Sequence, residues 1–254
     1  MLVSREKPGM EMQNFLHFLW GTAILKSWDN LLYRWKRRIF LQYLLNLWNE
    51  LDFGSMGALL LRLAAVFLCL TVHEVSHGLA AYALGDPTAR RQRRLSLNPL
   101  HHIDWLGLGC MVFCGFGWAK PVPVDARYFK KPKGGMALCA LAGPLSNMLL
   151  AALLLFLVRW SEGAGAQAVS SFAFTTAYLS IGLGVFNLIP FPPLDGSKVL
   201  AALLPNRLYA LWMRYERIGM FLVFALVMLG VGDSFLTKAI QIIFYWLAVL
   251  IFSV

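Results

Sequence analysis

The chain has 254 residues, of which 59% are hydrophobic and only 14% are charged, and its mean hydropathy is +0.62. This composition is too apolar for an ordinary soluble domain and is typical of a polytopic membrane protein. The net charge of +10 could indicate a nucleic-acid partner. The basic residues, however, cluster beside apolar segments, where membrane topology requires them, so no nucleic-acid partner is expected.

Residues 1–55 form an N-terminal extension ahead of the first long apolar segment. Within it, residues 28–51 place aromatic and aliphatic side chains at helical spacing, with charged and amide side chains largely opposite. This pattern predicts an amphipathic helix that lies on the membrane surface as an anchor, with a partner-binding or gating role as the alternative. No cleavable signal peptide is expected, because residues 1–13 are polar.

Residues 56–254 are predicted to form the membrane domain. Several of its stretches approach or exceed the roughly 20 residues that a helix needs to cross a bilayer core. The spans are expected at about 57–83, 136–158, 173–204 with an internal break, 218–232 and 239–253. The last two are short for complete crossings and could form a tight hairpin. We therefore expect an all-α polytopic membrane protein with a core at about 57–205 and C-terminal transmembrane helices at about 214–254.

The first predicted span contains the segment His73-Glu74-Val75-Ser76-His77, an HExxH pattern. On a helix, this spacing puts two imidazoles one turn apart on one face, beside a glutamate able to activate a water molecule. Such groups are costly to bury in an apolar stretch, and a metal ion is the obvious partner for them. The alternative is a pair of buried histidines bonded to neighbouring carbonyl groups.

A second carboxylate, Asp195, lies in the third predicted span. Of the thirteen acidic residues, only Glu74 and Asp195 fall well inside predicted spans. Three prolines just before Asp195 cannot continue a regular helix, and broken backbone at membrane depth must be buried in protein or line a watery cavity. At 1.5 Å per residue, His73 and Asp195 lie roughly 24 and 33 Å from the same end of their spans. His73 and Asp195 therefore both lie toward the opposite end of their spans, which the basic residues discussed below predict to be cytoplasmic.

This agreement in depth predicts that His73, His77 and Asp195 share one metal site. Two histidines and a carboxylate, with a fourth position open, are typical of catalytic rather than structural zinc. For Asp195, a helix cap or an ion pair with Lys198 is the alternative.

Three motifs in chain order resemble the site-2 protease family of intramembrane zinc metalloproteases. They are HEVSH in the first span, Gly143-Pro144-Leu145-Ser146-Asn147 in the second, and Asn187-Leu188-Ile189-Pro190 leading to Leu194-Asp195-Gly196 in the third. The segments GDPTARRQRRLSLNPLHHID, from Gly85, and GFGWAKPVPVD, from Gly115, resemble the compact bacterial branch of that family, which lacks a PDZ domain. The resemblance covers roughly residues 57–205.

The resemblance implies that His73, His77 and Asp195 hold one Zn²⁺ per chain and that Glu74 is the catalytic base. It also implies substrate or oxyanion contacts for Asn147 and Asn187, although helix pairing and capping of free backbone groups are the alternatives for these amides.

A core of three membrane helices with a re-entrant β-hairpin, supplied by residues 86–125, is the fold that the resemblance implies. Trp105 and an additional histidine, His101, depart from the branch's usual pattern in this region. His101, His102 and Asp104 could suggest a second metal site, but an interfacial loop held by hydrogen bonds is the preferred interpretation.

The predicted activity is that of an intramembrane zinc endopeptidase, in which Glu74 assists the attack of water on peptide bonds in or near transmembrane segments. Its partners would be transmembrane protein substrates and the lipid bilayer, in regulated intramembrane proteolysis or signal-peptide clearance. The alternatives are a metal transporter or sensor using the same site, an inactive scaffold, or another membrane zincin. A glutamate beside His73 argues against transport, which needs no general base.

The basic residues predict the orientation of a multi-pass protein in the plasma membrane, with its active site toward the cytoplasm. Only Arg159 and Lys238 fall on the opposite face. The N-terminal extension also carries basic residues, and these contradict the predicted orientation unless the extension itself crosses the membrane. Thirteen basic residues fall on the predicted cytoplasmic face: Arg90, Arg91, Arg93, Arg94, Lys120, Arg127, Lys130, Lys131, Lys133, Lys198, Arg207, Arg214 and Arg217. The arginines at 90–94 are interpreted as topology determinants or lipid-headgroup contacts.

Overall fold

The computed structural model describes residues 56–114, 118–163, 166–214, 216–229 and 233–252. The chain divides into two compact units, Met1–Ala58 and Leu59–Val254, and the features below concern the second. The amphipathic helix predicted at 28–51, like the rest of the 1–55 extension, lies outside the described residues.

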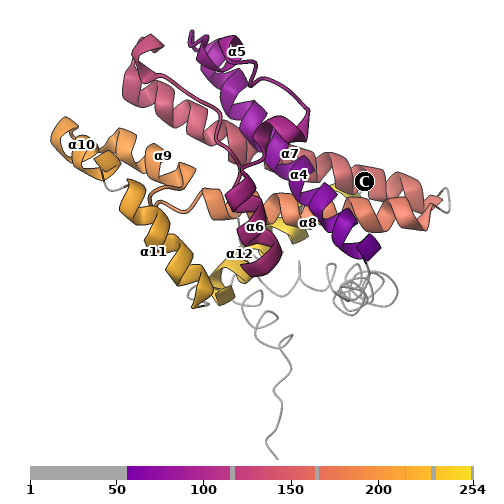
Figure 1. The fold of residues 1–254 in the computed structure, drawn as a ribbon. Helices are drawn as coiled ribbons and strands as arrows, with labels where there is room; N and C mark the ends of the chain where they lie inside the picture. Colours follow the sequence, from indigo (N-terminus) through magenta and orange to yellow (C-terminus); the bar gives the residue numbers. More distant parts are fainter. Residues whose placement is uncertain (1–55, 115–117, 164–165, 215, 230–232, 253–254) are drawn as a thin grey trace, which may run out of the picture. The chain divides into compact units, whose positions relative to one another are not determined.

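Four helices in the described part of the chain are long and apolar enough to cross a membrane (Figure 1). They are α4 (Met56–Ala83), α7 (Pro132–Gly163), α8 (Gln167–Asn187) and α12 (Asp233–Phe252). On α7, the large apolar side chains Leu149, Leu153 and Phe156 recur one turn apart, and each is more than 60% exposed. Lipid can cover such a stripe. The expected all-helical architecture is therefore confirmed for the described residues.

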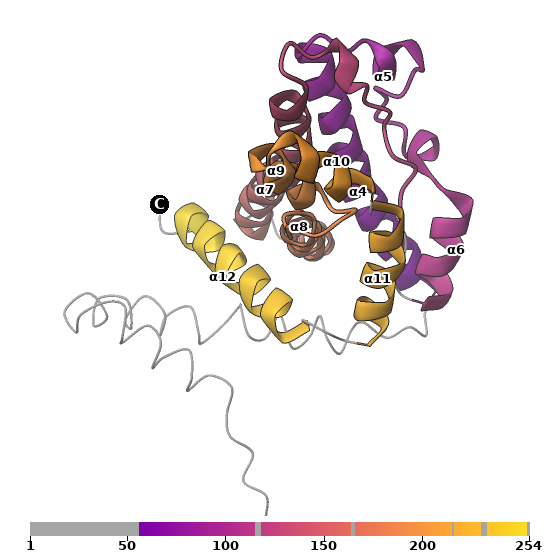
Figure 2. The ribbon, with the colours of Figure 1, turned by 90° about the vertical axis from the view of Figure 1, so that its left-hand side faces the viewer.

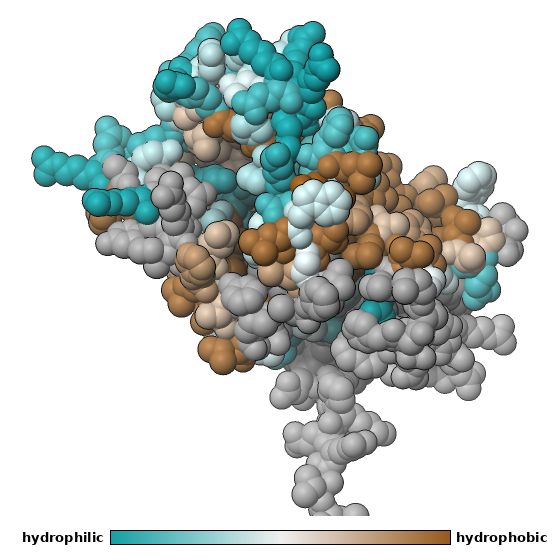
Figure 3. All heavy atoms as spheres, viewed as in Figure 1, coloured by the Kyte–Doolittle hydropathy of each residue, from teal (hydrophilic) through white to brown (hydrophobic). Residues whose placement is uncertain are grey.

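One face of the molecule is divided by polarity. Hydrophilic side chains gather around the short helix α5 (Thr88–Arg91) and the loops beside it, whereas hydrophobic side chains cover the flank of the long helices (Figure 3). This division follows the sequence pattern, in which basic residues adjoin the ends of apolar helices.

The third predicted span is interrupted, as its prolines predict. Helix α8 ends at Asn187, and α9 (Asp195–Leu203) begins after a loop that contains Pro190, Pro192 and Pro193. Within the loop, the N–H of Leu194 donates to the carbonyl of Phe191 at 2.9 Å. The loop therefore satisfies part of its own backbone hydrogen bonding while it turns the chain into α9.

Two shorter helices, α10 (Asn206–Arg214) and α11 (Glu216–Met228), connect α9 to α12. With 13 residues, α11 is too short to cross a bilayer core by itself. Helix α12 packs against α8 (Figure 2). At this contact, the rings of Phe174 and Phe244 lie 5.1 Å apart. Within the described residues, α12 has membrane-crossing length and α11 does not.

The β-hairpin expected within residues 86–125 is not confirmed. Ile103 and Ala119 form one isolated antiparallel bridge, and the described residues contain no strand. Helix α6 (Trp105–Cys114) occupies much of the segment instead. Its first turn is stabilised by Asp104, whose Oδ1 accepts from the N–H groups of Leu106 and Gly107 at 3.0 Å each, which is an N-cap that favours helix.

Close packing of α7 against α8 and α9 brings distant parts of the sequence together. A Cβ added to Gly184 would lie 3.2 Å from the carbonyl oxygen of Pro144 and 2.7 Å from Cε of Met148. A small residue in α8 therefore lets the two helix backbones approach, as is common between membrane helices. Since only the loop at 188–194 separates α8 from α9, this contact helps to set the position of Asp195.

Candidate metal centre

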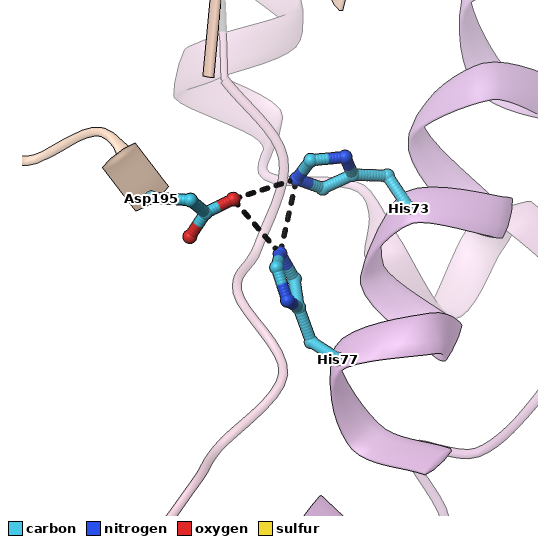
Figure 4. A group of neighbouring side chains, drawn as sticks. All are labelled: His73, His77 and Asp195. Atoms are coloured by element: carbon cyan, nitrogen blue, oxygen red, sulfur yellow. Dashed lines mark hydrogen bonds and ion pairs between the residues drawn. The ribbon is translucent and has the colours of Figure 1, made fainter. Parts of the chain in front are cut away.

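His73 and His77 project from successive turns of α4 toward Asp195, in the first turn of α9 (Figure 4). Oδ2 of Asp195 lies 3.1 Å from Nε2 of His73 and 3.0 Å from Nε2 of His77. The two Nε2 atoms are themselves 3.0 Å apart. His73 is 3% and Asp195 is 6% exposed, so three polar atoms from two separate helices converge in a buried place.

The spacing of these three atoms fits a zinc ion. Ligand atoms held tetrahedrally at about 2.0 Å from zinc are about 3.3 Å from one another, close to the spacing of this triangle. In the described part of the chain, this is the one group of histidine, cysteine, aspartate or glutamate side chains that could hold a metal ion in this way. The donor set of two imidazoles and a carboxylate is also one that zinc prefers.

A hydrogen bond to His77 leaves its Nε2 available as a ligand. Nδ1 of His77 lies 2.6 Å from the carbonyl oxygen of Cys139 in α7. Because a carbonyl oxygen only accepts, Nδ1 carries the hydrogen and donates it, so Nε2 of the neutral ring keeps its lone pair. No sequence signal could have identified this partner, since a backbone carbonyl is present at every position.

Gly143 lets α7 pass close to both imidazoles. A Cβ at this position would lie 2.5 Å from Nε2 of His77 and 2.6 Å from Cε1 of His73. Real Cβ atoms do not approach other heavy atoms so closely, so the residue must be glycine unless the histidines move. The sequence placed Gly143 in a motif but held no indication of this contact.

Asp195 is positioned by its own helix and by the loop before it. Gly196 permits the tight junction, because a Cβ there would lie 2.1 Å from the carbonyl oxygen of Leu188. The carboxylate lies in the first turn of α9, where the helix dipole favours a negative charge. Lys198 donates to Oδ1 at 3.4 Å, so the ion pair considered as an alternative role coexists with the histidine contacts, which engage Oδ2.

Glu74 lies next to the ligands in sequence but bonds to another part of the chain. Its Oε2 accepts from the N–H of Val122 at 2.9 Å. Val122 belongs to residues 118–125, which form neither helix nor strand and are named here the 118–125 segment. The HExxH pattern predicts Glu74 as the catalytic base but gives no sign of this donor.

Two buried charged residues hold the 118–125 segment. Arg94 donates from NH2 to the carbonyl oxygens of Lys120 and Pro121, at 2.7 and 3.2 Å. The other anchor is Asp86, whose Oδ2 accepts from the N–H of Asp125 at 2.7 Å. Arg94 is only 9% exposed, and its guanidinium bonds within the protein rather than to a lipid headgroup, whereas a role of the 90–94 arginines as topology determinants stays a prediction. The charge pattern of the sequence could not separate Arg94 from the three exposed arginines near it.

The two asparagines make contacts within the helix bundle. Asn147 is completely buried, and its Nδ2 donates to the carbonyl oxygen of Ser180 at 3.4 Å while the Ser180 hydroxyl donates to the Asn147 carbonyl at 2.8 Å. Asn187 is partly exposed, and its Nδ2 donates to the carbonyl of Leu183 in its own helix at 2.9 Å. The Asn147 bonds correspond to helix pairing, whereas the Asn187 side chain bonds back into its own helix and no bond to the backbone ahead of Pro190 is seen. A substrate contact for either residue stays a prediction.

His102 and Asp104 lie in a hydrogen-bonded loop. Nε2 of His102 donates to the carbonyl of Ser96 at 2.8 Å, and Asp104 caps α6 as described above. These contacts support the loop interpretation of the segment rather than a second metal site.

The buried ligand set and helices of membrane length define a membrane protein with a metallohydrolase-type site. Residues 161–230 match the family model described as peptidase family M50. The chain is 38% identical over 166 residues to "Putative zinc metalloprotease YwhC" of Bacillus subtilis, an alignment covering 63% of this chain and 75% of that protein. It is also 34% identical over 155 residues to "Putative zinc metalloprotease Rip2" of Mycolicibacterium smegmatis, covering 57% of this chain and 58% of that protein.

This chain therefore belongs to peptidase family M50, the site-2 protease family of zinc metalloproteases. It is a compact member, with no evident PDZ domain between the described helices. No solved structure matches the chain significantly.

Proposed function

We propose that this protein is an intramembrane zinc endopeptidase that hydrolyses peptide bonds in or near transmembrane segments of other membrane proteins. His73, His77 and Asp195 would hold the zinc ion, and Glu74 would be the catalytic base. The observation that carries the proposal is the triangle of His73 Nε2, His77 Nε2 and Asp195 Oδ2, which is 3.0 to 3.1 Å on a side. Its two histidines belong to α4, a helix of membrane-crossing length.

When bound, zinc supplies a Lewis acid that polarises the peptide carbonyl and lowers the pKa of water toward about 7. Glu74 removes a proton from the attacking water as its oxygen bonds to the carbonyl carbon. It then passes that proton to the leaving amine as the C–N bond breaks. The Val122 N–H holds one oxygen of Glu74, which limits the carboxylate's orientation while its other oxygen stays available for this transfer.

The substrate would be a transmembrane helix that unwinds locally, because a peptide bond inside a helix is shielded by its own hydrogen bonds. The proposed roles of this cleavage are regulated release of a membrane-bound factor and clearance of remnant signal peptides. Of the two asparagines, Asn187 is the better candidate for a substrate contact, because it is partly exposed whereas Asn147 is completely buried.

The proposed arrangement is a multi-pass protein of the plasma membrane, with a core of α4, α7 and α8 and a re-entrant region at 86–125. The site would lie toward the cytoplasm. Support comes from His77, which lies six residues, or about 9 Å along a helix, before α4 ends at Ala83. The exposed residues Arg90, Arg91 and Arg93 follow that end, as the positive-inside rule requires of a cytoplasmic loop. The extension at 1–55 would anchor the protein at the membrane surface.

The test is cleavage of a model single-span substrate by the full-length protein in lipid vesicles. The Glu74→Gln variant should keep its zinc, because it leaves all three ligands in place, yet lose cleavage. Undiminished zinc-dependent cleavage by Glu74→Gln would refute the assigned role of Glu74. Zinc flux into the vesicles without peptidase activity would favour transport instead.

A further inference from the structure

Helix α10 carries basic and large apolar side chains on one exposed face. Arg207 and Arg214 lie two turns apart, and Leu211 lies between them at spacings of four and three residues, which share one face of a helix. Leu208 precedes Leu211 by three residues and adjoins that face. Both arginines are exposed, and the two leucines are 50% and 48% exposed. These four residues are named here the α10 patch.

The exposed side chains of α7 indicate where the hydrocarbon core of a bilayer would lie. Large apolar residues that are more than half exposed recur on α7 from Leu138 to Phe156, which is 18 residues or about 27 Å along the helix. That length is close to the roughly 30 Å of a hydrocarbon core. Lys133 lies five residues before Leu138, or about 7 Å beyond this stretch. Since each headgroup layer is roughly 5–7 Å thick, Lys133 lies at the depth of the headgroups.

Contacts of Lys133 place α10 at the same depth. Its Nζ donates to the carbonyl oxygen of Leu204, directly after α9, at 2.7 Å and lies 5.1 Å from the centre of the Tyr209 ring in α10. Tyr209 is two residues from Arg207 and from Leu211, a spacing that puts it on the opposite side of the helix from them. Because the Tyr209 side of α10 faces Lys133, the α10 patch faces away from α7.

We propose that the α10 patch binds anionic lipids at the membrane surface, with its arginines on the headgroup phosphates and its leucines against the first carbons of the acyl chains. Basic and apolar residues on one exposed helix face are typical of a segment that lies in the interface of an anionic membrane. The surrounding sequence has the complementary charge, because residues 196–232 contain four basic residues and one acidic residue, Glu216. The placement rests on the proposed multi-pass arrangement, but it does not depend on peptidase activity.

A lipid suits the α10 patch better than a soluble partner. At headgroup depth, lipid surrounds the helices at high concentration, and a soluble protein would have to displace it. Charge alone would also suit a soluble acidic partner, but Leu208 and Leu211 are better explained by acyl chains, which start at the inner edge of the headgroup layer. An anionic lipid uses the cationic and the apolar half of the α10 patch together.

The test measures how tightly single lipids associate with the full-length protein. Native mass spectrometry from detergent micelles gives the association constants of phosphatidylglycerol, which is anionic, and of phosphatidylcholine, which has no net charge. We expect the protein to prefer phosphatidylglycerol. The double variant Arg207→Gln/Arg214→Gln should bind phosphatidylglycerol about ten-fold or more weakly and phosphatidylcholine unchanged, because each arginine near an anionic surface contributes about 1 kcal/mol, or about five-fold. Equal affinity of the unaltered protein for the two lipids would overturn the proposal.

The matched control is Arg91→Gln/Arg93→Gln. It removes the same charge from exposed positions in and after α5 (Thr88–Arg91), a helix without large apolar residues, and should keep the preference for phosphatidylglycerol. An equal loss in this control would show a diffuse charge effect and overturn the site.

A second variant tests the apolar half of the α10 patch. Leu208→Asn/Leu211→Asn keeps both arginines and should weaken the binding of phosphatidylglycerol, because the acyl chains lose their contact. Unchanged binding in this variant would leave only an anion contact and overturn the assignment to a lipid. None of these measurements requires catalysis, so failure of the peptidase proposal and failure of the lipid site are distinguishable.

Discussion

Val122 donates its backbone N–H to Oε2 of Glu74 across 2.9 Å, which joins the proposed base to a segment 48 residues further along the chain. Pro121 and Pro123 have no backbone N–H, so Val122 carries the one backbone N–H of residues 121–123. The position of Glu74 therefore depends on whatever holds the 118–125 segment. Arg94 does so through two carbonyl groups directly before Val122.

Replacing Arg94 should impair catalysis without removing the metal. Arg94→Gln loses hydrogen bonds from a charged donor, each contributing about 1.5–3 kcal/mol, and so loosens the segment that orients Glu74. We expect kcat to fall about ten-fold or more, since one pair of such bonds exceeds the 1.36 kcal/mol that corresponds to ten-fold. Zinc content, measured on the purified protein, should be unchanged, because Arg94 bonds to the carbonyl groups of Lys120 and Pro121, and neither residue is a proposed zinc ligand.

Arg91→Gln is the matched control for Arg94→Gln. Arg91 is exposed in α5 and carries the same charge only three residues away. If both variants lose the same activity, the effect belongs to the basic cluster as a whole rather than to the carbonyl contacts of Arg94.

Gly143→Ala should abolish metal binding. The added methyl group would lie 2.5 to 2.6 Å from both imidazole rings, so the histidines or α7 must shift, and zinc ligation tolerates little displacement. Zinc content and cleavage should fall together. Gly109→Ala in α6 is the control, because nothing lies within 4 Å of its added Cβ. Full zinc occupancy in Gly143→Ala would show that the site adapts more freely than its packing indicates.

The motifs and the contacts differ in how far the sequence could predict them. His73, His77 and Asp195 were predictable, because ionisable residues in apolar helices are rare and because three prolines marked the break before Asp195. The Cys139 carbonyl, the Gly143 contact and the burial of Arg94 were not. Each depends on which helix faces meet, and periodicity in a uniformly apolar helix hardly distinguishes one face from another. The same ambiguity explains why an apolar, glycine-containing segment was expected in a hairpin and is found partly as α6.

Replacing Asn147 with alanine should destabilise the protein more than replacing Asn187 with alanine. Asn147→Ala removes the donor to Ser180 and leaves a space between α7 and α8, so we expect a loss of about 1–2 kcal/mol in unfolding free energy. Asn187→Ala removes one bond within α8 at a partly exposed position and should change stability by less than about 1 kcal/mol. Thermal unfolding in detergent, followed together with kcat, measures both effects. A lowered kcat in Asn147→Ala at unchanged stability would instead favour an oxyanion contact.

Lys198 should tune the affinity for zinc. It donates to Oδ1 of Asp195, the oxygen that does not face the histidines, and so restrains the carboxylate in the orientation that presents Oδ2 to them. Loss of such an outer partner typically lowers metal affinity or activity by about 10- to 100-fold. Lys198→Met keeps the aliphatic length of the side chain but removes its donor. We therefore expect about ten-fold weaker zinc binding in competition with a chelator of known affinity, at unchanged stoichiometry.

Lys238→Met, at an exposed position of α12, controls for the loss of one positive charge. Equal zinc affinities in the two variants would show that α9 and the histidines orient Asp195 without help from Lys198.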